Sequence, residues 1–158
     1  MIIYIDLDGV LADFRKGLID WFNDTTPHYD EMIGTNFFET LEKFPSSDAL
    51  IALVVSIFGK YSICSMPLRD DHENSAYYKT RWVEQNLNPQ PEEIVITKRK
   101  EKYAKGNILI DDKENNVDAF NRKGGYGILY KAWEHDLKYL MAELHRVADE
   151  INNGSRQV

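Results

Sequence analysis

Apolar residues in this chain gather in short runs that each end in polar or charged residues. The runs are rich in isoleucine, valine, leucine and tyrosine, which is typical of strands buried on both faces of a parallel sheet. Five such runs cover residues 2–5, 61–65, 94–97, 107–112 and 126–130. Stretches with other periodicity separate them. The alternation predicts an α/β fold with a five-stranded parallel sheet and right-handed crossovers.

Helical spacing of apolar residues accounts for most of the chain between these runs. We expect helices over about 11–22, 73–87 and 133–151, with a shorter one around 117–120. The polar C-terminal tail, residues 152–158, is expected to be frayed.

The interval between the first helix and the second strand needs a separate interpretation. Residues 23–59 contain no convincing strand and are too long for a bare connection in a compact domain. They hold several aromatic residues and the apolar segment 49–58, which follows a capping sequence at Ser46. We therefore predict one domain, residues 1–158, with a small and mostly helical cap inserted at approximately residues 15–58.

Composition narrows the class of protein. The chain has 158 residues, of which 43% are hydrophobic and 28% charged, as expected of one globular domain with a substantial core. A net charge of −7 argues against a nucleic-acid polymer as partner but permits a small phosphate ester. Cys64 is the only cysteine, so no intrachain disulfide can form, which fits a cytoplasmic location. No apolar run is long enough to span a bilayer, so we expect no membrane association.

The first apolar run leads directly into two carboxylates. Asp6 and Asp8 are two positions apart, so both side chains should leave the sheet on the same side. Gly9 then permits a tight turn. Ligands in open α/β sheets bind outside the carboxyl ends of the strands, and paired carboxylates suit Mg²⁺. The alternative is a turn with two solvated aspartates.

The sequence Asp-Leu-Asp-Gly-Val-Leu-Ala-Asp-Phe at residues 6–14 is more specific than two spaced acids. It resembles the haloacid dehalogenase (HAD) superfamily of aspartate-nucleophile phosphotransferases, and most of all its 5'(3')-deoxyribonucleotidase branch. Residues 63–67, 79–87 and 108–112 look similar to the later motifs of that branch, in the same order. The resemblance implies a HAD-like, Rossmannoid three-layer sandwich.

The resemblance also implies an activity, the hydrolysis of deoxyribonucleoside 5'(3')-monophosphates with Mg²⁺ as cofactor. Asp6 would attack phosphorus and form an aspartyl-phosphate. Asp8 would protonate the leaving oxygen and then activate water. Ser65 and Lys79 would bind the phosphoryl group. Mg²⁺ would be held by Asp6, a backbone carbonyl at Asp8, and an acid of the pair at 111–112.

Some of these assignments keep alternatives. Lys79 is preferred to the lysines at 98, 100 and 102, although it could be a solvated helix residue. Asp111 and Asp112 could cap the following helix, or one could do so while the other binds metal. Lys113 stands where related enzymes often have arginine.

Met66 departs from the family in another way, since it replaces a second small hydroxyl residue and removes a phosphate donor. Phe14 matches a family aromatic near the nucleobase. The remaining cap aromatics either complete that pocket or form the core of the cap; they are Trp21, Phe37, Phe38 and Phe44. The basic run at residues 98–102 either forms a solvated loop or turns one member, Lys98 or Arg99, toward the phosphate.

Two other functions remain open at this point. The chain could be a HAD phosphatase for another small phosphomonoester, such as a sugar phosphate, or a non-catalytic phosphate-binding domain. For a deoxyribonucleotidase and for a phosphatase of another kind, the expected partner is a small phosphomonoester. HAD enzymes with small caps often pair, so a homodimer is also expected.

Overall fold

The computed structural model describes residues 1–154, so the last part of the tail predicted to be frayed lies outside the described residues. A parallel sheet of five strands forms the centre of the molecule, in the order β3-β2-β1-β4-β5. The strands are β1 (Ile3–Ile5), β2 (Ser62–Ser65), β3 (Ile94–Ile96), β4 (Ile108–Asp111) and β5 (Tyr126–Leu129). The predicted α/β class and the parallel five-stranded sheet are confirmed.

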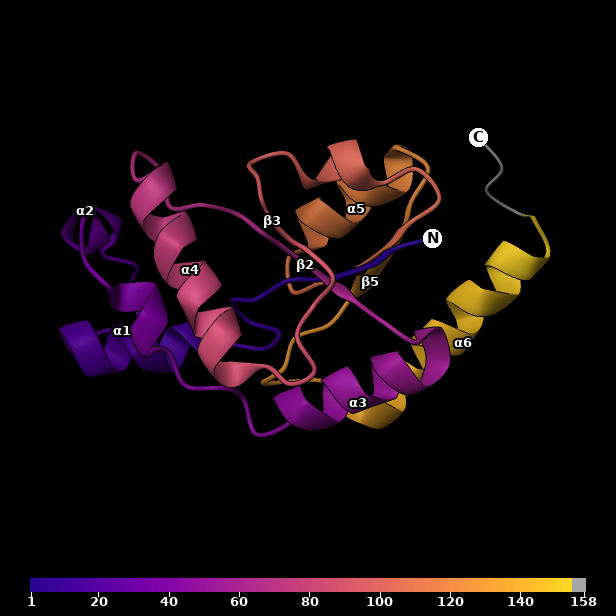
Figure 1. Ribbon diagram of the computed structural model, residues 1–158, viewed down its shortest axis with the longest axis horizontal. Coiled ribbons are helices and arrows are strands. Elements are labelled where there is room, and N and C mark those ends of the chain that lie inside the picture. The colour runs from indigo at the N-terminus through magenta and orange to yellow at the C-terminus, as the bar shows by residue number, and fades with distance from the viewer. Residues whose placement is uncertain (155–158) are drawn as a thin grey trace.

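Helices cover both faces of the sheet and make three layers (Figure 1). Side chains alternate along β1, so Ile3 and Ile5 join one apolar cluster while Tyr4 joins a second on the opposite face. The first cluster includes buried residues of α3 (Ser47–Phe58), α4 (His72–Asn86) and α6 (Leu137–Asn152). The second includes Phe120 of α5 (Glu114–Arg122). Both faces of the sheet are therefore buried, as the apolar strands require.

The first helix begins later than its periodicity suggests. Helix α1 spans Phe14–Phe22, although apolar spacing placed its start near residue 11. The carbonyl of Leu7 accepts hydrogen bonds from three successive N–H groups, those of residues 10–12, which winds this stretch into a tight turn. Asp13 then caps α1 by accepting from the N–H of Lys16. The turn holds Asp8 at the end of β1 and delays the helix.

The last helix also starts late, at Leu137 instead of Trp133, because Asp136 caps it by accepting from the N–H of Tyr139. Residues 131–135 form a separate loop after β5. The helix predicted over 73–87 is α4, displaced by one residue at each end.

The segment between β1 and β2 contains only helical elements: α1, α2 (Tyr29–Met32), a 3₁₀ helix η1 (Phe37–Thr40) and α3. Leu50, Ile51 and Val54 of α3 pack in the cluster beneath the sheet. The bounds of a cap, approximately 15–58, stay a prediction.

Residues 33–43, which we call the strap, are hydrogen-bonded along the length of α4. The contacts join Gly34 N to Asp71 Oδ2 (3.0 Å), Asn74 Nδ2 to Thr35 O (2.9 Å), Arg81 Nε to Glu39 Oε2 (2.7 Å) and Trp82 Nε1 to Leu41 O (2.7 Å). The Trp82 bond is buried, so it supplies a partner for an indole N–H that water cannot reach. The strap and α4 therefore form one continuous packing unit.

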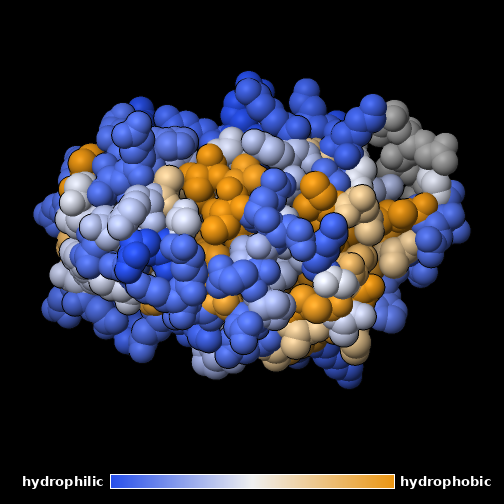
Figure 2. All heavy atoms as spheres, viewed as in Figure 1, coloured by the Kyte–Doolittle hydropathy of each residue, from blue (hydrophilic) through white to orange (hydrophobic). Residues whose placement is uncertain are grey.

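The sheet has two edge strands, β3 and β5. The three residues of β3 are only partly buried. Hydrophobic residues gather near the centre of the face seen in Figure 2, in the region where Figure 1 places β3. Among the described residues, no helix is both long enough and apolar enough to cross a membrane.

Candidate active site

Three carboxylates meet where β1 and β4 end. Ligand oxygens of Asp6, Asp111 and Asp112 all lie within 4.8 Å of one another. The two strands are neighbours, and Ile5 pairs with Ile110, so the residues that follow each strand are brought together by register. Such a group of hard oxygen ligands can hold a divalent cation such as Mg²⁺.

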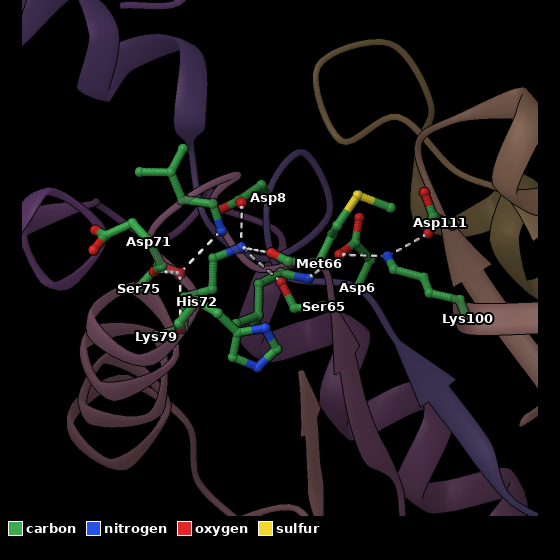
Figure 3. Close-up of polar contacts among 12 residues, drawn as sticks. Asp6, Asp8, Ser65, Met66, Asp71, His72, Ser75, Lys79, Lys100 and Asp111 are labelled. Atoms are coloured by element: carbon green, nitrogen blue, oxygen red, sulfur yellow. Dashed lines mark hydrogen bonds and ion pairs between the residues drawn. The ribbon is translucent and has the colours of Figure 1, made fainter. Parts of the chain in front are cut away.

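A buried lysine holds two of these carboxylates together (Figure 3). The ammonium of Lys100 lies 2.7 Å from Asp111 Oδ2 and 3.0 Å from Asp6 Oδ1. The N–H of Leu7 also donates to Asp6 Oδ1, at 2.8 Å. Both Lys100 and Asp111 are buried. The Asp6 carboxylate is thus fixed in orientation before any ligand binds.

The proximity of several acids changes their protonation. Burial of Asp6, together with the negative charge of Asp111, holds its pKa well above the usual range, although the charge of Lys100 opposes this. Burial and the charge of Asp111 raise the pKa of Asp112 to about 6. Burial alone would lower the pKa of Lys100, but the charges of Asp6 and Asp111 raise it above its usual value. Lys100 therefore remains an ammonium at neutral pH.

Asp111 and Asp112 have different surroundings. Asp111 is fully buried, and its carboxylate accepts from Lys100, from the N–H of Lys113 at 2.9 Å and from the Asn116 amide at 3.2 Å. Asp111 therefore also satisfies donors at the start of α5. Asp112 lines a cavity, and its buried Oδ1 has no hydrogen-bond partner among the described residues. An unsatisfied buried carboxylate oxygen is costly unless a cation lies against it.

Gly9 allows Asp112 to take this position. Its φ of 86° lies in the left-handed region, and a Cβ there would collide with the Asp112 carboxylate. The expectation that Gly9 permits a tight turn is confirmed, and the close approach of Asp112 is a second reason for glycine at this position.

Lys79 of α4 is the second buried lysine of the site. Its ammonium lies 2.9 Å from Asp8 Oδ2, 2.9 Å from Ser65 Oγ and 2.6 Å from the carbonyl oxygen of Met66 (Figure 3). The Phe38 ring lies 4.5 Å from the ammonium, a cation–π distance. Lys79 is therefore not a solvated helix residue, and the structure brings it together with Asp8 and Ser65.

A cavity of about 810 Å³ opens above these groups. Asp8, Lys79, Asp112 and the Met66 side chain reach its wall. Five cationic and three acidic side chains line it, in a chain whose net charge is −7. The lining is thus suited to an anionic ligand.

The aromatic residues named from the sequence separate into two groups. Phe14, Phe38 and Phe44 line the cavity, and Phe14 stacks with Phe38 at a centroid distance of 6.3 Å. Phe37 is fully buried and packs against Trp21, and neither lines the cavity. The first group can contact a ligand. Phe37 forms part of the core, whereas Trp21 is exposed beside it.

Lys100 is the residue that sequence reasoning misplaced. The basic run at residues 98–102 was expected either to be solvated or to turn Lys98 or Arg99 toward the phosphate. The structure exposes both of these side chains, pairs Arg99 with Glu101 at 2.9 Å, and buries Lys100 at the start of a 3₁₀ helix, η2 (Lys100–Tyr103). Lys98 and Arg99 are thus solvated, and the assignment of an inward side chain to one of them was wrong because only the fold shows which lysine of the run turns inward. In the sequence, the position of Lys100 a few residues after β3 is the feature that could have indicated its place near the carboxyl ends of the strands.

Comparison with known proteins identifies the family. Residues 1–138 match the family described as 5' nucleotidase, deoxy (pyrimidine), cytosolic type C protein. The chain belongs to this family. It is 31% identical over 142 residues to a human protein named 5'(3')-deoxyribonucleotidase, cytosolic type, covering 71% of this chain and 70% of that protein. A Bordetella bronchiseptica protein named putative 5'(3')-deoxyribonucleotidase is 27% identical over 139 residues, covering 72% and 74%.

Solved structures support the fold. A HAD-family enzyme from Bacteroides thetaiotaomicron, determined as a magnesium complex, superposes with a TM-score of 0.52 at 17% identity, covering 89% of this chain and 97% of that one. L-2-haloacid dehalogenase from Xanthobacter autotrophicus superposes with a TM-score of 0.54 at 9% identity, covering 80% and 76%. The predicted HAD-like fold is confirmed, as is the resemblance to the deoxyribonucleotidase branch.

Proposed function

We propose that this protein is a Mg²⁺-dependent phosphomonoester hydrolase that removes phosphate from deoxyribonucleoside 5'(3')-monophosphates through an aspartyl-phosphate on Asp6. One observation carries the proposal: an oriented aspartate, a three-carboxylate cluster and two buried lysines lie together beneath a cavity whose charged side chains are mostly lysine and arginine. Family membership and the names of the human and Bordetella relatives support the activity.

The residues present fit a divalent cation. The unpartnered Oδ1 of Asp112, together with the nearby oxygens of Asp6, offers ligands that suit Mg²⁺, and the Bacteroides neighbour was solved with this ion. The backbone carbonyl of Asp8 completes the proposed set, with Asp111 contributing negative charge and holding Lys100 in place. Mg²⁺ would supply positive charge that reduces the repulsion between the phosphate dianion and the nucleophile.

Asp6 is suited to act as the nucleophile because its carboxylate is held from one side. Leu7 N–H and Lys100 both bind Oδ1, so the group cannot rotate freely. Fixing a nucleophile in one orientation lowers the entropic part of the barrier. Asp8 lines the cavity, where it can reach the leaving oxygen and later the attacking water.

Ser65 and Lys79 are proposed to bind the phosphoryl group. An ammonium has three donors, and the three contacts of Lys79 with Asp8, Ser65 and Met66 use all of them. A phosphoryl oxygen must therefore replace one partner. Replacing Asp8 frees its Oδ2 to take part in proton transfer, which couples phosphate binding to the availability of the general acid–base.

The nucleotide preference rests on the wall of the cavity. Phe14, Phe38 and Phe44 present aromatic surface of the kind on which nucleobases stack. Phe14 is the proposed base contact, as the family resemblance implies. Met66 lines the same cavity without a hydroxyl, so phosphate binding depends more strongly on Lys79 and Ser65.

The decisive experiment measures phosphate release from deoxynucleoside, ribonucleoside and sugar monophosphates, with Mg²⁺ and with EDTA. We expect Mg²⁺-dependent release from deoxynucleotides, reduced at least ~10³-fold in Asp6→Asn. Glu101→Gln, which changes a carboxylate paired with Arg99 outside the cavity, is the matched control. Release from sugar phosphates alone would keep the mechanism and refute the nucleotide assignment. Mg²⁺ binding without turnover would instead favour a phosphate-binding domain.

The proposal includes a cytoplasmic location, supported by the human relative's description as cytosolic type. Pairing into a homodimer stays a prediction, to be measured by sedimentation.

A further inference from the structure

Trp133 is placed differently from the other two tryptophans. Trp21 donates its indole N–H to Thr40, and Trp82 donates to Leu41. The Trp133 indole has neither a hydrogen bond nor a ring contact within residues 1–154, and the residue is 57% exposed. It nevertheless lines the cavity above the site carboxylates. A large aromatic group without a partner at the wall of a ligand cavity offers an unused stacking surface.

The loop that carries Trp133 is braced. The N–H of Ala132 donates to the carbonyl of Gly9 at 3.1 Å, which ties the loop to the turn that carries Asp8. Lys131 and His135 close the loop with two hydrogen bonds, Lys131 N to His135 Nδ1 at 2.9 Å and His135 N to Lys131 O at 2.7 Å. The His135 ring stacks on Tyr139 of α6 at 4.1 Å. The exposure of the indole is therefore built into an ordered loop.

This arrangement fixes Trp133 relative to the reacting groups. The loop follows β5, so Trp133 stands at the same carboxyl edge of the sheet as Asp8 and Asp112. One side of the cavity carries Phe14 of α1 and Phe38 of the strap. Trp133 reaches the cavity from another part of the chain, the loop between β5 and α6. A ligand whose phosphate reaches Lys79 has an aromatic group available from each of these two parts of the chain.

We propose that Trp133 determines specificity by stacking on the nucleobase of the bound nucleotide. The inference rests on the proposed function. An indole face attracts a flat aromatic base far more than a sugar, and an immobilised loop costs little ordering entropy when the ligand binds. The indole N–H adds one donor for a base or sugar oxygen. Trp133 thereby distinguishes a nucleotide from a phosphate ester that lacks a base.

The test compares two substrates with the same ester, a deoxynucleoside 5'-monophosphate and 2-deoxyribose 5-phosphate. We expect Trp133→Ala to raise the ratio of the nucleotide KM to the sugar-phosphate KM about tenfold. Trp133→Phe keeps an aromatic face, so its KM ratio should stay close to that of the unmodified protein. Tyr77→Ala is the matched control, because Tyr77 is also 57% exposed but does not line the cavity. An unchanged ratio in Trp133→Ala would overturn the inference while leaving the proposed function intact.

A binding measurement separates this inference from turnover. In Asp6→Asn, a titration with the nucleotide should quench tryptophan fluorescence, since Trp133 is the most exposed of the three indoles. The quenching should disappear in the double variant Asp6→Asn/Trp133→Phe. Quenching that persists there would assign the contact to another tryptophan and refute the role of Trp133. Absence of nucleotide binding by both proteins would refute the proposed function as well.

Discussion

The buried ammonium of Lys100 offers a sharp test of how the site is held together. Lys100→Met keeps the length of the side chain and removes the charge. Two unit charges about 3 Å apart attract by about 5 kcal/mol at an effective dielectric near 20. Lys100 makes two such pairs, at 2.7 and 3.0 Å, which offset the cost of burying the charges. Removing one partner of a buried network strands the remaining charge, so we expect the free energy of unfolding to fall by about 3–5 kcal/mol.

The assay is urea unfolding followed by circular dichroism at pH 7.5 in EDTA. Lys102→Met is the matched control, because Lys102 lies in the same 3₁₀ helix, carries the same charge and is exposed. Mg²⁺ should recover part of the loss in Lys100→Met, since the cation replaces positive charge beside Asp6. Lowering the pH should also reduce the difference in the free energy of unfolding between Lys100→Met and the unmodified protein, because the carboxylates left without Lys100 take up protons. If the free energy of unfolding falls no more in Lys100→Met than in Lys102→Met, the conclusion that Lys100 stabilises the buried carboxylates is refuted.

Two further predictions concern Asp112 and Gly9. A carboxyl whose pKa is raised from 3.8 to about 6 stabilises the fold below its unfolded pKa and loses that contribution as the pH rises through 6. Between pH 4 and pH 7, the free energy of unfolding of the metal-free protein should therefore fall by up to about 3 kcal/mol more than that of Asp112→Asn, as measured by urea unfolding in EDTA. The same pH dependence of this free energy in both proteins would contradict the prediction. Gly9→Ala should weaken Mg²⁺ binding about tenfold or more in calorimetric titration, because its Cβ displaces the Asp112 carboxylate. Gly106→Ala shares the positive φ but meets open space, so equal effects on Mg²⁺ would refute the steric argument.

Strands and their terminal acids could be predicted because their signal is local. Each strand is a short apolar run, and parallel pairing then brings Asp6, Asp8 and Asp112 to one edge by topology alone. The start of α1 could not be predicted from periodicity, because the apolar residues at 10 and 11 belong to a turn closed by the carbonyl of Leu7.

Side-chain burial within charged segments was also beyond the sequence. Three lysines in residues 98–102 look alike locally, and only the tertiary structure turns Lys100 toward Asp6 and Asp111. The same holds for the two neighbouring acids, since packing against α5 satisfies Asp111 and leaves Asp112 facing the cavity. Trp133 was expected to begin a helix, whereas the cap at Asp136 leaves it in a loop above the site.

The hydrogen-bonded contact between the strap and α4 has a consequence for how new substrates can arise. Lys79 is anchored on the side of α4 that faces Asp8, whereas the strap supplies Phe38 to the cavity wall. In the proposed function, the ammonium that binds the phosphoryl group and the ring that shapes the cavity wall thus come from separate stretches of chain that meet along one helix. Substitution of Phe38 alone would remodel the wall, while Asp8, Ser65 and the carbonyl of Met66 would still hold the ammonium, so the substrate can change while the proposed chemistry is kept.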